Sequence, residues 1–304
     1  MLPIKKCWIV TVFVALLMAL PSAAAADKLR VVAATADLEY FARQIGGDLV
    51  DVDVIAAGNR DLHYVEVLPS YLLKLRRADV YLKLGLELDV WSQSLIDGSR
   101  NSDLIVTDCS AGINALEVPT FKADARYGDL HRYGNPHYWL SPENVPTICA
   151  NITDALTAAD PQHADAYESG RDGYLARLKS KMNEWDADKG AMGNVEFIGY
   201  HNTWPYFCEF FGCHTVAFVE EYPGVTPSPS HLTKLLERIR QEQIPAVAYE
   251  PFHDKRTPEW LAGKSGCRTV VLTESVGGLP GTETYEKLID TLVARLTSVA
   301  QVVE

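Results

Sequence analysis

The sequence has no apolar segment long enough to cross a membrane. Its longest apolar run, from Cys7 to Leu20, has 14 residues, whereas a transmembrane helix needs about 20. Lys5 and Lys6 precede this run and small residues follow it up to Ala26, a pattern typical of a cleaved secretory signal. We therefore predict that residues 1–26 are a signal peptide and that the mature protein is periplasmic. Cys7 opens the apolar run instead of standing at the cleavage site, which predicts no lipid-anchor cysteine.

Several other patterns are missing, and each absence excludes a class of protein or site. The chain has no excess of basic residues, and its formal net charge of −12 argues against a nucleic-acid partner. It contains no C-x-x-C pair and no H-E-x-x-H motif, so neither a thiolate zinc cluster nor a helical zinc-protease site is expected.

The mature chain is poor in cysteine, with five after the predicted signal. An odd number leaves at least one free thiol if the others pair. Cys208 and Cys213 are close in sequence and would be able to bridge a helix end to the next strand. A set of small buried thiols is an equally good interpretation, and the sequence does not decide the pairing.

Apolar runs alternate with helical patterns in both halves of the chain, which predicts α/β architecture with parallel sheets. The length of 304 residues and a hydrophobic content of 47% allow one core for each half. Strands are predicted at 29–35, 50–57, 80–85, 104–107, 195–200, 215–219, 246–249 and 269–272. Helices are predicted at 38–45, 70–77, 142–159, 229–241, 258–264 and 285–299.

The middle of the chain carries no strand signal. Asp160 and Pro161 form a helix start, and apolar residues then recur at helical spacing up to Trp185. A helix over 161–188 would be about 40 Å long, more than one lobe needs. We therefore predict an N-terminal lobe at 27–160, a linking helix at 161–188 and a C-terminal lobe at 189–304, with the two lobes facing each other across a cleft.

Three histidines stand where predicted elements end or begin. His63 ends a polar loop before a helix, His137 follows Pro136 at a helix entrance, and His201 ends an apolar run. They are 74 residues (137 minus 63) and 64 residues (201 minus 137) apart. Ligands in open α/β sheets bind beyond the carboxyl ends of the strands, so this spacing predicts a metal site assembled from distant parts of the fold.

The order of several short motifs resembles one known family. The chain is similar to the metal-binding (cluster A-I) solute-binding proteins of ABC transporters, the zinc and manganese receptors. The resemblance covers nearly the whole mature chain. It rests on the motifs Arg43-Gln44-Ile45-Gly46-Gly47-Asp48, Asp61-Leu62-His63, Gly85-Leu86-Glu87-Leu88, Asn135-Pro136-His137-Tyr138-Trp139-Leu140-Ser141-Pro142-Glu143-Asn144, Tyr200-His201-Asn202 and Tyr249-Glu250-Pro251.

The resemblance implies a divalent metal held between the two lobes. The family's ligand positions match His63, His137 and His201, and its fourth position, usually an Asp, matches Glu274. Glu is one methylene longer, so His253 or water stays open as the fourth ligand. The implied protein is a monomer without enzymatic activity that delivers its ion to the membrane permease of an ABC importer.

Three imidazoles and one carboxylate form a set that suits tetrahedral Zn²⁺, whereas Mn²⁺ prefers more oxygen ligands. In the family, manganese receptors tend to carry a carboxylate at the position of His201. We therefore expect Zn²⁺ as the transported ion, with Mn²⁺ as the alternative. A zinc hydrolase, and an adhesin or siderophore receptor on a similar scaffold, are the other interpretations. His131 is an intermediate candidate, and Glu250 is expected to hold a ligand or to line the cleft.

Overall fold

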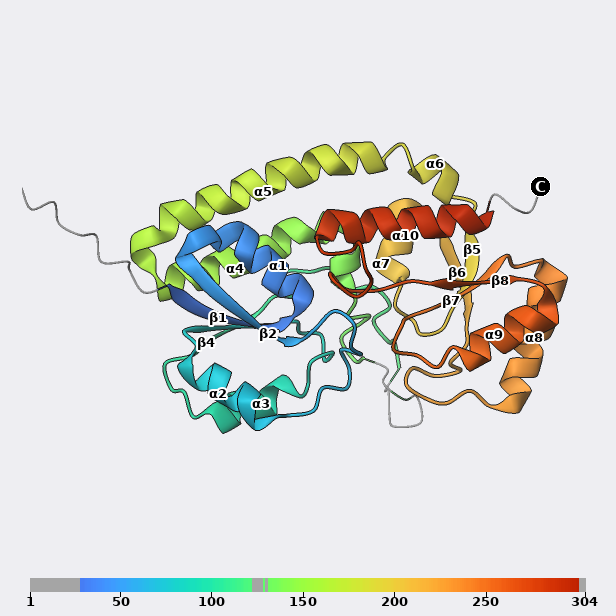
Figure 1. The fold of residues 1–304 in the computed structure, drawn as a ribbon, viewed down its shortest axis with the longest axis horizontal. Coiled ribbons are helices and arrows are strands. Elements are labelled where there is room, and N and C mark those ends of the chain that lie inside the picture. Colours follow the sequence, from blue (N-terminus) through green and yellow to red (C-terminus); the bar gives the residue numbers. More distant parts are fainter. Residues whose placement is uncertain (1–27, 122–127, 129–130, 301–304) are drawn as a thin grey trace, which may run out of the picture.

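Two four-stranded parallel sheets, each flanked by helices, make up the molecule (Figure 1). The computed structural model describes residues 28–121, 128 and 131–300, so the predicted signal peptide lies outside the described residues. The predicted α/β class with two parallel-sheet lobes is confirmed. None of the helices in the described ranges combines the length and the apolar character of a membrane span.

The first sheet has the strand order β2-β1-β3-β4. Its strands are β1 (Leu29–Thr35), β2 (Val50–Ala56), β3 (Val80–Lys83) and β4 (Ile105–Asp108). The flanking helices are α1 (Ala36–Gly46), α2 (Pro69–Arg77), α3 (Ser92–Ser99) and α4 (Val145–Ala159). The sequence analysis did not predict α3, since a short segment rich in serine that contains Gly98 has weak helix propensity.

The second sheet repeats this topology with the order β6-β5-β7-β8. Its strands are β5 (Glu196–Gly199), β6 (His214–Phe218), β7 (Ala246–Tyr249) and β8 (Arg268–Val271). Its helices are α7 (Pro205–Phe211), α8 (Pro229–Glu242), α9 (Arg256–Ser265) and α10 (Tyr285–Ala300). In both sheets the first strand of the lobe is an inner strand with a neighbour on each side. The loop that follows this strand therefore leaves the sheet near the middle of its edge.

One long helix runs along the first lobe and reaches the second lobe only with its C-terminal end (Figure 1). This helix, α5, spans Ala164–Trp185 after a 3₁₀ turn at Pro161–His163. It is shorter than the predicted 161–188 because the chain turns after Trp185, where the Asp188 N–H donates to the Trp185 carbonyl at 2.9 Å. A separate short helix, α6 (Lys189–Met192), follows.

The main hydrophobic core passes through both lobes. One continuous cluster contains residues of the first sheet together with Phe197, Ala248 and Leu272 of the second lobe. Phe41 of α1 lies against Tyr285 of α10, with ring centroids 5.2 Å apart. A smaller cluster lies on the other face of the second sheet and includes Ile198. The expectation of one core for each lobe is therefore replaced by a shared core and a satellite.

Candidate metal centre

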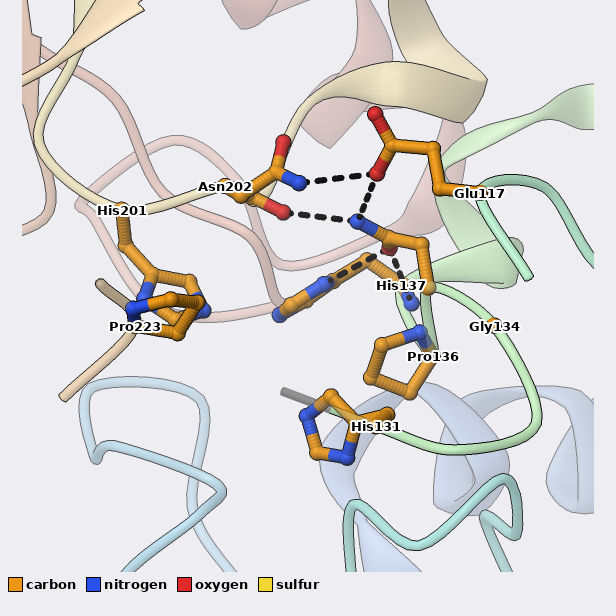
Figure 2. Close-up of a pocket in the computed structure, with 9 residues that line it drawn as sticks. Glu117, His131, Gly134, Pro136, His137, His201, Asn202 and Pro223 are labelled. Atoms are coloured by element: carbon orange, nitrogen blue, oxygen red, sulfur yellow. Dashed lines mark hydrogen bonds between the residues drawn. The ribbon is translucent and has the colours of Figure 1, made fainter. Parts of the chain in front are cut away.

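The three histidines singled out from the sequence converge at one point between the sheets. His63 lies in the loop after β2, His137 precedes the 3₁₀ turn Tyr138–Leu140, and His201 follows β5. One ring nitrogen from each lies within 4.8 Å of those of the other two. His137 and His201 are buried, and the His63 side chain is 10% exposed. Figure 2 shows His137 and His201 at this point, with His131 nearby.

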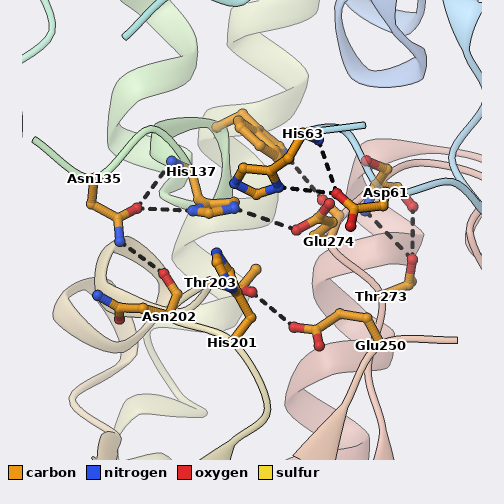
Figure 3. A network of polar contacts seen from close by, with 12 residues as sticks. Asp61, His63, Asn135, His137, His201, Asn202, Thr203, Glu250, Thr273 and Glu274 are labelled. Atoms are coloured by element: carbon orange, nitrogen blue, oxygen red, sulfur yellow. Dashed lines mark hydrogen bonds and ion pairs between the residues drawn. The ribbon is translucent and has the colours of Figure 1, made fainter. Parts of the chain in front are cut away.

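Each first-lobe histidine is oriented by the residue two positions before it. Asp61 Oδ1 lies 3.0 Å from His63 Nδ1 and accepts the His63 backbone N–H at 2.9 Å. Asn135 Oδ1 lies 3.0 Å from His137 Nδ1 and accepts the His137 backbone N–H at 3.0 Å. With Nδ1 occupied, each ring turns its Nε2 toward the centre (Figure 3), as metal-binding imidazoles usually do.

His201 has a distant partner instead. Its Nδ1 lies 2.8 Å from Glu220 Oε2, 19 residues later, and the same oxygen accepts the Gly224 N–H at 3.0 Å. Burial alone would lower the pKa of His201, but the hydrogen bond and charge of Glu220, with the charges of Glu250 and Asp61, outweigh burial, so the pKa is raised. Such a carboxylate–histidine pair strengthens the imidazole as a metal ligand.

His137 is a buried imidazole that cannot easily hold a proton. Burial, followed by the charges of His63 and His201, lowers its pKa well below the usual value. Its Nε2 has no hydrogen-bond partner among the described residues. A buried polar atom without a partner costs free energy, which a metal ion at the centre would relieve.

Glu274 is the fourth residue brought to this point. Its Oε2 lies 3.6 Å from His137 Nε2, and its Oε1 has no hydrogen-bond partner among the described residues (Figure 3). Trp139 Nε1 donates to the Glu274 backbone carbonyl at 2.7 Å and so holds the loop. Burial, followed by the charges of nearby carboxylates, raises the pKa of Glu274 well above its usual value. A cation beside it would favour the ionised form.

His131 and His253 lie at the edges of the centre. The His131 ring centroid is 5.4 Å from that of His63, and burial lowers the pKa of His131 to about 3. His131 Nε2 is buried without a hydrogen-bond partner among the described residues. The loop acids Asp124 and Asp129 lie outside the described residues.

His253 is held away from the three histidines by its own contacts. Its ring stacks on Tyr200 with centroids 4.1 Å apart, and its Nε2 lies 3.4 Å from Glu250 Oε2. Glu250 in turn accepts a hydrogen bond from Thr203 Oγ1 at 2.8 Å, and burial raises the pKa of Glu250 to about 7. Glu250 is fully buried and is not among the residues that line the cavity beside the histidines, so these contacts hold it against Thr203 and His253 instead.

The space beside the ring nitrogens is small. A cavity of about 130 Å³ is lined by ten residues, among them His63, His201, Glu220 and Glu274, and none of the ten is Lys or Arg. This volume suits an ion with a few waters, and a neutral to acidic lining favours a cation. The siderophore interpretation requires a wide basic pocket, which this cavity is not.

The orienting partners are the residues that the sequence analysis missed. Asp61 and Asn135 had a local signal, since an Asp or Asn two residues before a histidine is able to accept its backbone and ring N–H groups. Glu220 had no such local signal in the sequence, because it meets His201 only through the pairing of β5 with β6. The Glu220 N–H donates to the Tyr200 carbonyl at 3.0 Å, one step beyond that pairing.

Comparisons with known proteins agree with this arrangement. The family model described as ZnuA, zinc-uptake complex component A, periplasmic, matches residues 31–299. The chain is similar to the high-affinity zinc uptake system protein ZnuA of Bacillus subtilis, with 24% identity over 254 residues, covering 83% of this chain and 80% of the relative.

A further relative is named for a different metal, and a solved structure shares the fold. The manganese ABC transporter substrate-binding lipoprotein PsaA of Streptococcus pneumoniae is 27% identical over 270 residues, covering 83% of this chain and 84% of the relative. A crystal structure of ZnuA superposes with a TM-score of 0.78 at 25% identity, covering 90% of this chain and 99% of that one. The fold and the broad ligand class are therefore shared, while the relatives differ in their metal.

Proposed function

Because the chain belongs to the family of metal-binding (cluster A-I) substrate-binding proteins of ABC transporters, we propose that it captures Zn²⁺ outside the cytoplasm and delivers it to the permease of an importer. Members of this family bind solutes and are not enzymes, so the hydrolase interpretation has no support. The choice of zinc and the periplasmic location are part of the proposal.

The preference for zinc in this proposal rests on the set of donor atoms. Three imidazole nitrogens within 4.8 Å of one another and a single carboxylate nearby match the tetrahedral nitrogen-rich sites of Zn²⁺. Mn²⁺ favours oxygen ligands and higher coordination numbers. His201, with Glu220 behind it, provides nitrogen at the position where a carboxylate would favour manganese.

In this proposal His63 and His137 bind the ion from the first lobe, and His201 and Glu274 bind it from the second. The proposed lobes are residues 27–160 and 189–304, joined by the segment 161–188, and the protein acts as a monomer. Glu274 is the fourth ligand because its carboxylate is 3.6 Å from His137 Nε2, while His253 is engaged with Tyr200 and Glu250.

The test uses mature protein without an affinity tag, stripped of metal by a chelator. Zn²⁺ and Mn²⁺ are titrated separately and in competition, and the bound metal is counted by elemental analysis. We expect one Zn²⁺ per chain and displacement of Mn²⁺ by Zn²⁺. A stoichiometry near zero would remove the metal-receptor proposal, and a preference for Mn²⁺ would transfer the function to manganese uptake.

His214→Ala is the matched control for these titrations. His214 is an exposed histidine at the start of β6 and is not one of the three clustered residues. Loss of zinc binding in this variant would mean that the assay reports general surface histidine binding and not the proposed centre.

A further inference from the structure

We propose that Cys208 and Cys213 form a disulfide in the mature protein, closing the turn between α7 and β6. Their Sγ atoms lie 2.9 Å apart, which is inside the contact distance of two sulfur atoms that are not bonded. All five cysteines of the described residues are thiols in the structure. This pair is therefore already brought together by the fold, and only a small movement separates it from a covalent bond.

The local backbone explains how residues five apart meet. Cys208 lies in α7, and Gly212 ends this helix with a φ of 81°, a conformation that glycine adopts without strain. The Gly212 N–H donates to the Cys208 carbonyl at 2.7 Å. Cys213 follows at once and leads into β6, so the turn directs both sulfur atoms to the same side.

The environment favours the bonded form. Both side chains are buried, and the contact with Cys208, together with burial, raises the pKa of Cys213. The Cys213 thiol thus has little access to the thiolate form, and once the bond exists its reduction would have to place a thiolate at this buried position. Cys208 and Cys213 also border a surface groove, through which a reagent would reach them.

Formation of the bond is a two-electron oxidation. The two thiols lose two protons and two electrons to give one S–S bond. The electrons and protons reduce the disulfide of a thiol–disulfide exchange partner, which leaves as two thiols. The proposed location outside the cytoplasm is a compartment in which such oxidants act.

The bond would brace the second-lobe side of the metal centre. His201 is four residues before α7, and Glu220 is two residues after β6. A link between the end of α7 and the start of β6 therefore ties together the two segments that carry the His201–Glu220 pair. The inference does not depend on which metal is bound, and it is tested on metal-free protein.

Peptide mapping tests the bond directly, because Glu209 lies between the two cysteines. The mature protein is secreted into an oxidising compartment, denatured in the presence of N-ethylmaleimide so that buried free thiols are alkylated as they become exposed, and digested with a protease that cleaves after Glu. The digest separates residues 197–209, which contain only Cys208, from residues 210–220, which contain only Cys213. We expect these two peptides to stay linked until a reductant is added, and three alkylated thiols in the intact chain.

A second sample is unfolded, reduced and refolded with oxidised glutathione, which guards against incomplete oxidation during expression. Linked peptides in this sample also support the proposal. If both cysteines are alkylated before digestion even after this treatment, the proposal is wrong. A link through Cys109, Cys149 or Cys267 would overturn it as well.

Thermal unfolding tests whether the proposed disulfide stabilises the fold. A disulfide that closes so short a loop gives a small stabilisation, so reduction should lower the unfolding midpoint by about 4 °C. The double variant C208S/C213S should show no change on reduction, whereas C267S should keep the full shift. An equal response of the parent and the double variant to reductant would contradict the brace.

Discussion

In the first lobe, the groups that orient the metal-facing histidines come from the same loop, whereas in the second lobe they come from distant parts of the chain. Asp61 and Asn135 each stand two residues before their histidine and bind both its ring and its backbone. His201 depends on Glu220, and the Glu274 loop depends on Trp139 and on Asp37, which accepts the Val276 N–H at 3.0 Å.

The difference separates two ways of building a rigid site. A local turn is formed by the loop itself and needs only that the loop keeps its sequence. A distant partner is in place only when β5, β6 and the interface between the lobes are all formed. The loop of His63 therefore offers its imidazole in a preset geometry, whereas the second lobe's geometry depends on the packing of the whole molecule. The His137 loop stands between the two cases, because Asn135 Nδ2 also donates to the Asn202 carbonyl of the second lobe at 2.8 Å.

The largest expected effect comes from removing a ligand in either lobe. His63→Ala, His137→Ala and His201→Ala should each weaken zinc binding by about 100-fold or more, since each removes one of three nitrogen donors. Competition titration measures this loss, and circular dichroism of the metal-free variants should show an unchanged fold. A variant that binds as tightly as the parent would remove that histidine from the site.

The variants Glu220→Ala and Asp61→Ala test most directly the comparison between a distant and a local orienting partner. The Glu220 side chain is 10% exposed and the Asp61 side chain 28% exposed, so water replaces Asp61 more readily. We expect zinc affinity to fall about 100-fold for Glu220→Ala and about 10-fold for Asp61→Ala, within the range for groups that orient a metal-binding histidine.

Glu221→Ala, which removes an exposed neighbouring carboxylate, is the control for general loss of negative charge and should bind like the parent. Equal losses for Glu220→Ala and Asp61→Ala would show that the origin of the partner, local or distant, does not matter.

Glu274→Ala should cost less than any of the three histidines, about 10-fold in zinc affinity, because three imidazoles and a water can still hold Zn²⁺. It should also reduce hydrogen-exchange protection in the metal-loaded protein over residues 274–280, which are held through few side chains. Glu274→Asp is the matched control, since it keeps the charge and restores the residue usual in the family. Unchanged affinity and protection in Glu274→Ala would assign the fourth position to water or to another residue.

The smallest effect concerns Asp37, the first-lobe residue that braces the Glu274 loop. Burial raises the pKa of Asp37 from 3.8 to about 7, so between these values the folded protein binds a proton that the unfolded chain releases. The free energy of unfolding should therefore fall as the pH rises through this window, by at most about 1.4 kcal/mol per pH unit.

Asp37→Asn should remove the Asp37 contribution and so make the slope shallower, while Glu250 and Glu274, whose pKa values are also raised by burial, keep their own contributions. Urea unfolding of metal-free protein between pH 5 and pH 8 measures the difference. Asp48→Asn, at an exposed aspartate in the turn after α1, should keep the slope of the parent. Parallel curves for the parent and Asp37→Asn would show that Asp37 is ionised in the folded protein throughout this range.

The sequence was most informative where local patterns determine the structure. The apolar run of β1 and the helical spacing of α5 predicted these elements, and Pro136 before His137 predicted a stiff loop. Helix α7 was not predicted separately, because a run of aromatic residues has no clear helical period. The pairs His201–Glu220 and Asp37–Val276 could not be predicted from the sequence. Their members are 19 and 239 residues apart and meet only through tertiary packing.

The core shared by both lobes also decides how the chain can be divided or recombined. Phe41, Tyr174 and Tyr285 come from helices α1, α5 and α10, and the three rings meet around Phe41. A fragment ending near Asp160 would leave part of this aromatic contact facing water, so neither lobe is a transplantable module. A working chimaera of two relatives would have to take these three helices from the same parent. The segments exchanged between the parents would have to be those that pack in the smaller hydrophobic cluster, under α8 and α9.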